Sequence, residues 1–252
     1  MSADNSFSIR SWRLHLSHLT RAVLDAVLPP VCANCNRVGE LFCADCLAAV
    51  TWVEQPICQK CGRPQKRRSA RCFSCQNIPF PLDRIRAATL HVDPVRRVLH
   101  QMKYEGYFAL SEPLGNLMIK AWPKWYHPFD LVLPIPLHPQ RKRHRGYNQS
   151  ELLVRELQKG LGWSSDPAAL KRNRQTRPQL GLTASERRAN VCNAFGADSV
   201  RVDGKRILLV DDVCTTGSTL ASAAEALLDA GARSISAYCL TQAIGNQDIT
   251  SV

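Results

Sequence analysis

A short apolar run followed by acids and small hydroxyl residues is the strongest hydrophobic pattern in the chain. The four residues from Ile207 to Val210 are all apolar, and Asp211-Asp212 follow directly. Such a run predicts a strand that is buried on both faces, as in a parallel sheet. Thr-Thr-Gly-Ser-Thr comes next at 215–219, and apolar spacing returns from Leu220. The pattern therefore predicts a strand, a loop and then a helix over residues 221–229.

Similar segments on both sides extend this unit to an α/β domain with a parallel sheet and flanking helices. Further strands are predicted over residues 84–92, 131–136 and 234–240. Helices are predicted from Pro94 to about 103, over 107–122 and 151–159, and from a capping box of Thr183 and Glu186 toward 194. The last two strands and the helix between them predict a right-handed β-α-β unit. Its first strand carries the acids at its carboxyl end.

Changes in composition divide the chain into segments. The predicted segments are a tail with an amphipathic helix at 1–28, a cysteine-rich module at 29–81, the α/β domain at 82–245 and a tail at 246–252. Charged residues interrupt the apolar stretch from Ile9 to Leu28, which excludes a signal-peptide core. No run of eighteen apolar residues exists, so no membrane insertion is expected. We therefore expect a cytoplasmic protein.

Cysteine spacing predicts two zinc ions. Eight of the 11 cysteines form four C-x-x-C pairs, namely Cys32/Cys35, Cys43/Cys46, Cys58/Cys61 and Cys72/Cys75. Each pair offers two thiolates, and two pairs complete a closed, structural four-thiolate zinc site. A single site or an iron–sulfur cluster is a less favoured alternative. Short intervals within each half favour sequential pairing into two ribbons over an interleaved cross-brace.

The loop after the acids is suited to a phosphorylated sugar. A turn of small residues at the start of a helix aims backbone N–H groups and a positive helix end at one point, as phosphate binding requires. The two carboxylates beside it can accept hydrogen bonds from the vicinal hydroxyls of ribose. Ser, Thr and Gly also cap ordinary helices, but the adjacent acids favour a ligand site at the end of the strand. The chain has no G-x-x-x-x-G-K-[ST] sequence, so an ATP-binding P-loop is excluded. Cys214, between Val213 and this loop, is expected to be a packing residue.

Positive charge is concentrated between the predicted strands. The whole chain has a formal net charge of +12. Residues 139–188 alone carry twelve Lys or Arg and four Asp or Glu, a balance of +8. Residues 137–150 are therefore predicted to form a loop that binds a second anionic group such as pyrophosphate, although a solvent-facing turn has a similar composition. Residues 172–179 are polar, basic and poor in apolar anchors, which predicts a mobile lid or an ordinary surface loop.

The acids and the Thr-Thr-Gly-Ser-Thr loop resemble the 5-phosphoribosyl-1-pyrophosphate (PRPP) motif of type I phosphoribosyltransferases. The order of further motifs resembles the ComF/GntX family, in which a double zinc ribbon precedes a phosphoribosyltransferase domain. These motifs are the cysteine pairs, Leu133 to Leu137, Arg145 to Gln149, and Thr176 to Gln179 with Glu186-Arg187-Arg188 and Asn190. That family is linked to natural competence and to the handling of incoming single-stranded DNA.

The resemblance implies roles for individual residues. Asp211 and Asp212 would hold the ribose hydroxyls, and Mg²⁺ would bind together with PRPP. The 5-phosphate would be bound by Thr215, Thr216, Gly217, Ser218 and Thr219. The pyrophosphate loop would consist of Pro134, Ile135, Pro136 and Leu137. The lid would contain Arg172, Thr176, Arg177 and Gln179. The predicted catalytic residues are Asp211, Asp212, Arg145 and Lys103.

One departure from the motif concerns the acceptor. Several purine-salvage members have an acid in the position of Thr215, where it serves as a base toward the nucleobase. Threonine cannot fill that role, so either no base is needed or another residue supplies it.

Two functions are compatible with these features. The first is Mg²⁺-assisted phosphoribosyl transfer linked to DNA uptake or nucleotide metabolism. The second is a non-catalytic single-stranded DNA-binding competence protein that works with DNA-uptake proteins. In that case PRPP is a regulatory ligand, or the fold is retained as a scaffold. Trp122, Trp125 and Tyr126 could then stack on bases, although aromatics near prolines are often part of a core. A basic tip at residues 62–71 leaves contact with nucleic acid open.

Overall fold

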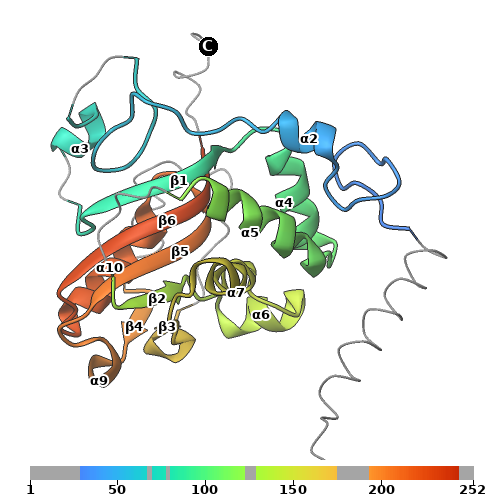
Figure 1. Cartoon of the computed structure of the whole chain (residues 1–252). Helices are drawn as coiled ribbons and strands as arrows, with labels where there is room; N and C mark the ends of the chain where they lie inside the picture. Colours follow the sequence, from blue (N-terminus) through green and yellow to red (C-terminus); the bar gives the residue numbers. More distant parts are fainter. Residues whose placement is uncertain (1–28, 67–69, 78–79, 123–128, 175–192, 244–252) are drawn as a thin grey trace, which may run out of the picture.

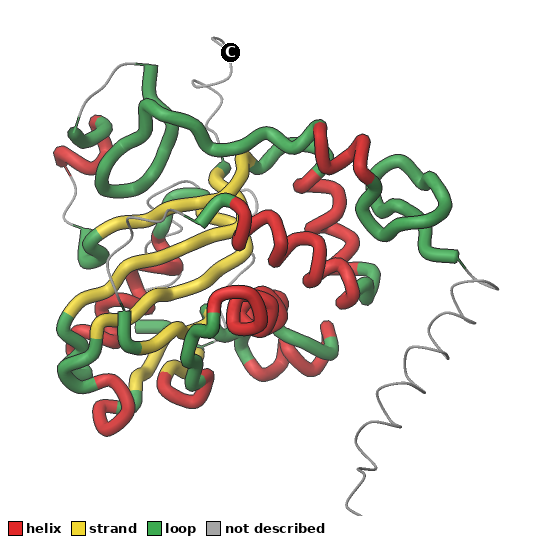
Figure 2. The backbone as a smooth tube through the Cα atoms, viewed as in Figure 1, coloured by secondary structure: helices red, strands yellow, loops and turns green. Residues whose placement is uncertain are grey.

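A parallel sheet lies at the centre of the molecule (Figures 1 and 2). The computed structural model describes residues 29–66, 70–77, 80–122, 129–174 and 193–243. The sheet has four strands in the order β1-β6-β5-β2, and every neighbouring pair is parallel. They are β1 (Arg84–Leu90), β2 (Leu131–Pro134), β5 (Arg206–Cys214) and β6 (Ser234–Gln242). The predicted α/β fold with a parallel sheet is confirmed.

Helices cover both faces of the sheet. The helices on one face are α4 (Val95–Tyr104), α5 (Ser111–Lys120) and α7 (Gln149–Leu161), and α10 (Ser218–Asp229) lies on the other. Successive side chains of a strand point to opposite faces, so β5 contributes to both cores. Leu208 and Val210 pack with the first group of helices, whereas Ile207 and Leu209 pack with α10. All four are at most 1% exposed, which explains the uninterrupted apolar run.

The order of elements follows the sequence prediction with local differences. Strand β5 continues to Cys214, because Asp211, Val213 and Cys214 remain paired with β6. Helix α10 begins at Ser218, directly after Gly217 in the left-handed conformation. The predicted helix at 107–122 is a 3-10 turn at Phe108–Leu110 followed by α5.

Residues 137–150 are not a single loop, contrary to the prediction. They contain helix α6 (Pro139–Arg145), which His138 caps by accepting a hydrogen bond from the Gln140 N–H. Gly146 ends the helix at φ 85°, a conformation that favours glycine. The element was missed because α6 has no apolar stripe and no buried residue.

Several short elements were not predicted. They are α2 (Ala44–Ala48), α3 (Phe73–Asn77), a 3-10 turn at Pro167–Ala169, β3 (Leu170–Arg172), β4 (Phe195–Ala197) and α9 (Ser199–Val202). Strands β3 and β4 form a separate antiparallel pair. The predicted helices at 9–28 and 183–194 lie wholly or almost wholly outside the described residues. The predicted domain boundaries stay predictions.

The cysteine-rich module is fastened to the edge of the sheet at β1. The linker between its two halves forms an antiparallel bridge from Trp52 to Thr89. The Leu90 N–H donates to the Thr51 carbonyl at 2.8 Å, and the Ile85 N–H donates to the Lys60 carbonyl at 2.7 Å. These bonds use backbone groups of an edge strand that would otherwise face solvent.

Gly62 lies at the closest approach between this module and β1. Its φ is +72°, and a Cβ atom there would lie 2.5 Å from the Ile85 carbonyl oxygen. Gly106 has a similar φ of +77° but open space around the Cβ position.

We predict that Gly62→Ala destabilises the protein by about 3 kcal/mol, since it adds a backbone clash to the cost of positive φ. The matched variant Gly106→Ala should cost only about 1 kcal/mol, because it has the positive φ alone. Chemical denaturation of the zinc-loaded protein measures both. Equal losses in the two variants would contradict the close packing at Gly62.

Candidate functional site

A cavity of about 570 Å³ opens at the carboxyl ends of β1, β2 and β5. In open α/β sheets, ligands bind at the carboxyl ends of the strands. The wall of the cavity includes His91, Lys103, Arg145, Arg172, Asp211 and Asp212. Segments far apart in the sequence therefore converge on the two acids that follow the apolar run.

The acids are held by fixed partners. Lys103 Nζ from α4 lies 2.8 Å from Asp212 Oδ1, and both side chains are largely buried. Asp211 Oδ1 accepts hydrogen bonds from Ser150 Oγ at 3.0 Å and from the Asp212 N–H at 2.9 Å. Asp212 Oδ2 is buried and has no hydrogen-bond partner among the described residues. A buried oxygen of this kind is normally satisfied, so a ligand hydroxyl would complete the site.

The carboxyl group of Asp211 has a raised pKa, chiefly because it is buried. Burial, and then repulsion from Asp212, raise the pKa of Asp211 above its ordinary value. Lys103 and the hydrogen bonds from Asp212 and Ser150 act in the opposite direction. Displaced pKa values of this kind are common at functional sites.

The loop at 215–219 lies beside the acids, at the start of α10. Thr215 and Thr219 line the cavity, and Thr216 Oγ1 is 2.7 Å from Ser218 Oγ. Gly217 has φ 75°, and a Cβ atom there would lie 2.9 Å from the Phe80 ring. The loop therefore needs glycine both for its backbone conformation and for packing. Helix α10 is twelve residues long, so its first turn presents N–H groups and a positive dipole to this region.

The predicted pyrophosphate loop contributes alternate residues to the site. Ile135 and Leu137 line the cavity, whereas Pro134 and Pro136 are not part of its wall. The Asn148 side chain donates to the Ile135 carbonyl at 3.0 Å and caps α7 through the Ser150 N–H. This amide fixes the distance between the loop and the helix that carries Ser150.

Basic side chains form the opposite wall. Arg145 contacts Gln149, and its guanidinium group lies 5.3 Å from the centre of the Tyr104 ring. Arg172 belongs to strand β3, is 8% exposed and stacks over Phe195 at 5.2 Å. The structure therefore places Arg172 in a fixed wall and not in a lid. The other predicted lid residues, Thr176, Arg177 and Gln179, lie outside the described residues.

Sequence reasoning did not single out two residues of this cavity that make hydrogen bonds near the acids. His91 follows β1 directly, and Ser150 lies in the first turn of α7. The position of His91 at the carboxyl end of a predicted strand was an available signal. The position of Ser150 depends on a helix boundary that periodicity does not fix. Arg141, on α6, belongs to the basic segment that was predicted to bind the second anionic group.

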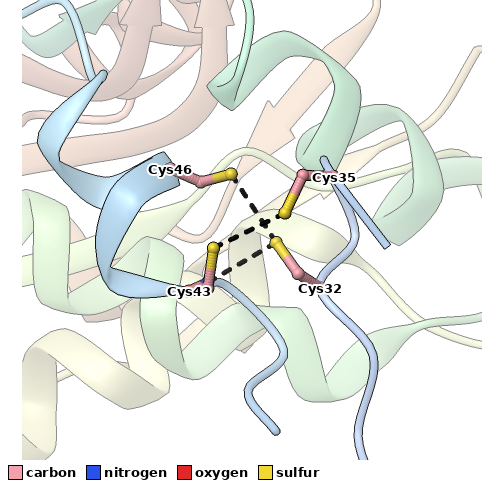
Figure 3. Close-up of side chains that lie close together, drawn as sticks. All are labelled: Cys32, Cys35, Cys43 and Cys46. Carbon is pink, nitrogen blue, oxygen red and sulfur yellow. Dashed lines mark hydrogen bonds between the residues drawn. The ribbon is translucent and has the colours of Figure 1, made fainter. Parts of the chain in front are cut away.

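The eight paired cysteines form two four-sulfur clusters in the sequential arrangement. Cys32, Cys35, Cys43 and Cys46 form one, and Cys58, Cys61, Cys72 and Cys75 form the other. Within the first, Cys32 and Cys46 sulfurs are 3.8 Å apart, and Cys35 and Cys43 sulfurs are 3.6 Å apart (Figure 3). Four thiolates around zinc at about 2.3 Å have sulfurs about 3.8 Å apart, so both clusters fit the ion.

Backbone N–H groups prepare the sulfurs for metal binding. The Cys43 N–H points at Cys32 Sγ and the Cys72 N–H at Cys58 Sγ, at 3.5 and 3.3 Å. Burial alone would raise the thiol pKa values, but hydrogen bonds from backbone groups lower the pKa of Cys32 to about 6 and that of Cys58 to about 7. The thiolate is the form that binds zinc. These are two closed structural zinc sites.

Two other predictions concern packing. Cys214 is 3% exposed, which confirms its structural role. Trp122 packs against the rings of Phe129, Trp163 and Tyr238, with centroids 4.6–5.9 Å apart. It is therefore a packing residue and not a base-stacking platform, while Trp125 and Tyr126 lie outside the described residues. Among the described helices, none is both long and apolar enough to cross a bilayer.

Comparisons with known proteins agree with this arrangement. The family model described as "Double zinc ribbon domain" matches residues 23–76, and that described as "Phosphoribosyl transferase domain" matches residues 166–247. The chain is 32% identical to the DNA utilization protein YhgH of Escherichia coli K12 over 226 residues, covering 86% of this chain and 99% of that protein. It is 30% identical to Competence protein F of Haemophilus influenzae, covering 75% and 85% of the two chains. It is 28% identical to Competence protein ComFC of Bacillus subtilis, covering 81% and 85%.

We predict two zinc ions per chain, measured by elemental analysis of the purified protein. Cys46→Ser should lose one ion and Cys75→Ser the other, because each removes one of four thiolates from a closed site. Cys214→Ser is the matched control, since this cysteine is buried outside both clusters, and it should retain both ions. A visible iron–sulfur absorption, or a single zinc in the unaltered protein, would contradict the assignment.

Proposed function

The chain belongs to the ComF family, which combines a double zinc ribbon with a phosphoribosyltransferase domain. From this premise we propose that the protein binds PRPP and transfers the phosphoribosyl group of PRPP to an acceptor. One observation carries this proposal. Asp211 is bonded to Ser150 and Asp212 to Lys103, beside the start of α10 and in a cavity that is also lined by arginines. Carboxylates suit the sugar hydroxyls, the helix start suits the 5-phosphate, and the cations suit pyrophosphate.

The residues of the chain would act mainly by positioning and by charge. Asp211 and Asp212 accept hydrogen bonds from the ribose hydroxyls, while the ion pair with Lys103 orients Asp212. Residues 215–219 bind the 5-phosphate. Arg145, Arg141 and Arg172 face the departing pyrophosphate and stabilise the charge that develops on it.

Mg²⁺ is the ion expected to accompany PRPP. It binds oxygen ligands and keeps much of its coordination for substrate and water, so we assign it no ligand of the protein. When bound, it would supply positive charge that stabilises the departing pyrophosphate. The carboxylate-lined end of the cavity is compatible with such an ion.

We place the protein in the cytoplasm. Eight thiols in two zinc clusters require a compartment in which cysteines stay reduced. PRPP and the nucleotides made from it would be its small-molecule partners.

A second candidate function is the binding of single-stranded DNA. Tyr104, Tyr107 and Phe108 are 67%, 50% and 63% exposed at the end of α4 and the following turn. They adjoin the basic helix α6, since Arg145 stacks on Tyr104 and Phe108 contacts Tyr147 edge to face. Exposed aromatics beside a row of cations are the combination that binds single strands without sequence preference. The names of the relatives from E. coli and H. influenzae refer to DNA utilization and competence. DNA-uptake proteins would be partners in this case.

We predict that Asp211→Asn with Asp212→Asn abolishes the PRPP-dependent rise in melting temperature and weakens PRPP binding at least ~100-fold, because each carboxylate accepts a charge-assisted hydrogen bond. The control is Glu225→Gln with Asp229→Asn, two exposed acids on α10 whose removal changes the net charge equally. Zinc content and unliganded melting temperature report on folding. PRPP binding of the first variant at the strength of the unaltered protein would contradict the proposed site.

We predict that Tyr107→Ala with Phe108→Ala weakens binding to a fluorescent oligothymidine about 10-fold or more, since base stacking contributes about 1–3 kcal/mol per aromatic ring. Fluorescence anisotropy at two salt concentrations measures this effect and the contribution of the cations. Val200→Ala is the control, because Val200 is 92% exposed on α9, apart from the basic helix. Unchanged affinity in the aromatic variant would argue against this surface, and PRPP binding should persist in both variants.

A further inference from the structure

The ring of His91 is held at the carboxyl end of the sheet by hydrogen bonds to β6. The His91 N–H donates to the Gln242 carbonyl at 2.8 Å, which continues the pairing of β1 and β6 by one residue. Its Nδ1 lies 3.0 Å from Thr241 Oγ1. Thr241 is fully buried, and its hydroxyl donates to the Asp212 carbonyl at 3.4 Å. The histidine is thus connected to the backbone of the acid pair through one hydroxyl.

The contacts of Thr241 accommodate a ring with its proton on Nδ1. A hydroxyl group has one proton, and when Thr241 donates it to the Asp212 carbonyl, the hydroxyl accepts a hydrogen bond from His91 Nδ1. In this tautomer Nε2 has its lone pair free, and Nε2 makes no hydrogen bond to any residue that the structure describes. His91 lines the same cavity as Asp211 and Asp212.

Burial and the charge of Lys103 favour the neutral ring of His91. Burial, and then the positive charge of Lys103, lower the pKa of His91 from its ordinary value. Arg96 acts in the same direction, while Asp212 and Asp93 oppose it. The ring is therefore neutral at pH 7, as a proton acceptor must be.

Other residues of the cavity are poorly suited to remove a proton. Thr215 has no basic group. Asp211 Oδ1 already accepts two hydrogen bonds, and this carboxylate is assigned to the ribose. His100 has a 63% exposed side chain, and its Nδ1 is engaged with Glu105 at 3.7 Å.

We propose that His91 is the general base of phosphoribosyl transfer, accepting at Nε2 the proton that the acceptor nucleophile loses. The inference rests on the proposed transfer reaction. In that step the bond from C1 of the ribose to the pyrophosphate oxygen breaks, and pyrophosphate leaves with the electron pair. The nucleophile forms the new bond to C1, and its proton passes to His91.

The proposal also defines the class of acceptor. A base is required only when the nucleophile enters with a proton, as an amine or a ring N–H does. A nucleophile that is already an anion would gain nothing from it. The acceptor is therefore a neutral compound that loses a proton from its attacking atom, such as an amine or a ring N–H, and the base missing at Thr215 is supplied from the end of β1.

The test compares His91→Gln and His91→Ala with the control His100→Gln. Pyrophosphate release from PRPP and Mg²⁺ is measured from pH 4.5 to 9 with ammonium chloride, adenine, guanine or uracil as the acceptor, or with water alone. For each nucleophile that the unaltered protein uses, both His91 variants should lose about 100-fold or more in kcat, the usual contribution of a general base. PRPP affinity, measured from the shift in melting temperature, should stay unchanged. Added imidazole should partly restore His91→Ala and leave His91→Gln unaffected.

The pH dependence gives a second readout. In the unaltered protein the rate should rise as His91 loses its proton and then level off, and this step should vanish in His91→Gln. A step that remains belongs to Asp211, whose pKa is raised by burial. The variant His100→Gln should keep the step of the unaltered protein.

Three outcomes would contradict these statements separately. Unaltered kcat in His91→Gln would overturn the role of His91 and leave phosphoribosyl transfer intact. Absence of pyrophosphate release from every protein, with PRPP still bound, would overturn the transfer reaction. Nitrogen NMR of labelled histidine tests the geometry without turnover, and a proton on Nε2 in the neutral ring would overturn the base.

Discussion

The parallel pairing of β5 with β6 is the constraint on which the rest of the molecule depends. The two strands stay in register from Arg206 and Ser234 to Cys214 and Gln242, well beyond the apolar run of β5. The first half of the pair is buried between the helices and holds the domain together. The second half extends to the cavity, where it places Asp211 and Asp212 beside Thr241. The same hydrogen-bond ladder therefore stabilises the core and fixes the positions of Asp211 and Asp212. The acids of the site are thus held on a rigid strand.

The zinc module contributes to this arrangement through the other edge of the sheet. Strand β1 has β6 on one side, and on the other it bonds with Thr51, Val53 and Lys60 of the cysteine-rich module. The ribbons have little apolar core of their own, so the metal must provide much of their folding free energy. Because His91 continues directly from β1, loss of zinc would loosen the strand that positions it. This gives the ribbons a structural connection to the cavity without any contact between zinc and ligand.

The sequence contained enough information for the sheet, the zinc clusters and the acid loop, because each has a local pattern. Apolar runs mark buried strands, C-x-x-C pairs mark the clusters, and the small residues after Asp212 mark a turn into a helix. Helix α6 could not be predicted from an apolar pattern, because it has basic residues on all sides and no buried residue. Its ends depend on the cap by His138 and on the positive φ of Gly146. The placement of Arg172 required the three-residue pairing of β3 with β4, which is too short for periodicity to detect. The contact between His91 and Thr241 joins residues 150 positions apart and follows only from strand register.

The electrostatics of the cavity are arranged for a ligand with two kinds of group. On one side Asp211 and Asp212 repel each other, and burial raises the pKa of Asp211. On the other side burial lowers the pKa of Arg172, and the neighbouring Arg141 adds to that effect. The charged forms of Asp211 and Arg172 are therefore each less favourable here than in water. A molecule that brings hydroxyl donors to the acids and anionic oxygens to the arginines relieves both costs at once, whereas a simple anion relieves only one. This requirement for both groups in one ligand favours a phosphorylated sugar with a second anionic substituent over phosphate or nucleic acid backbone alone.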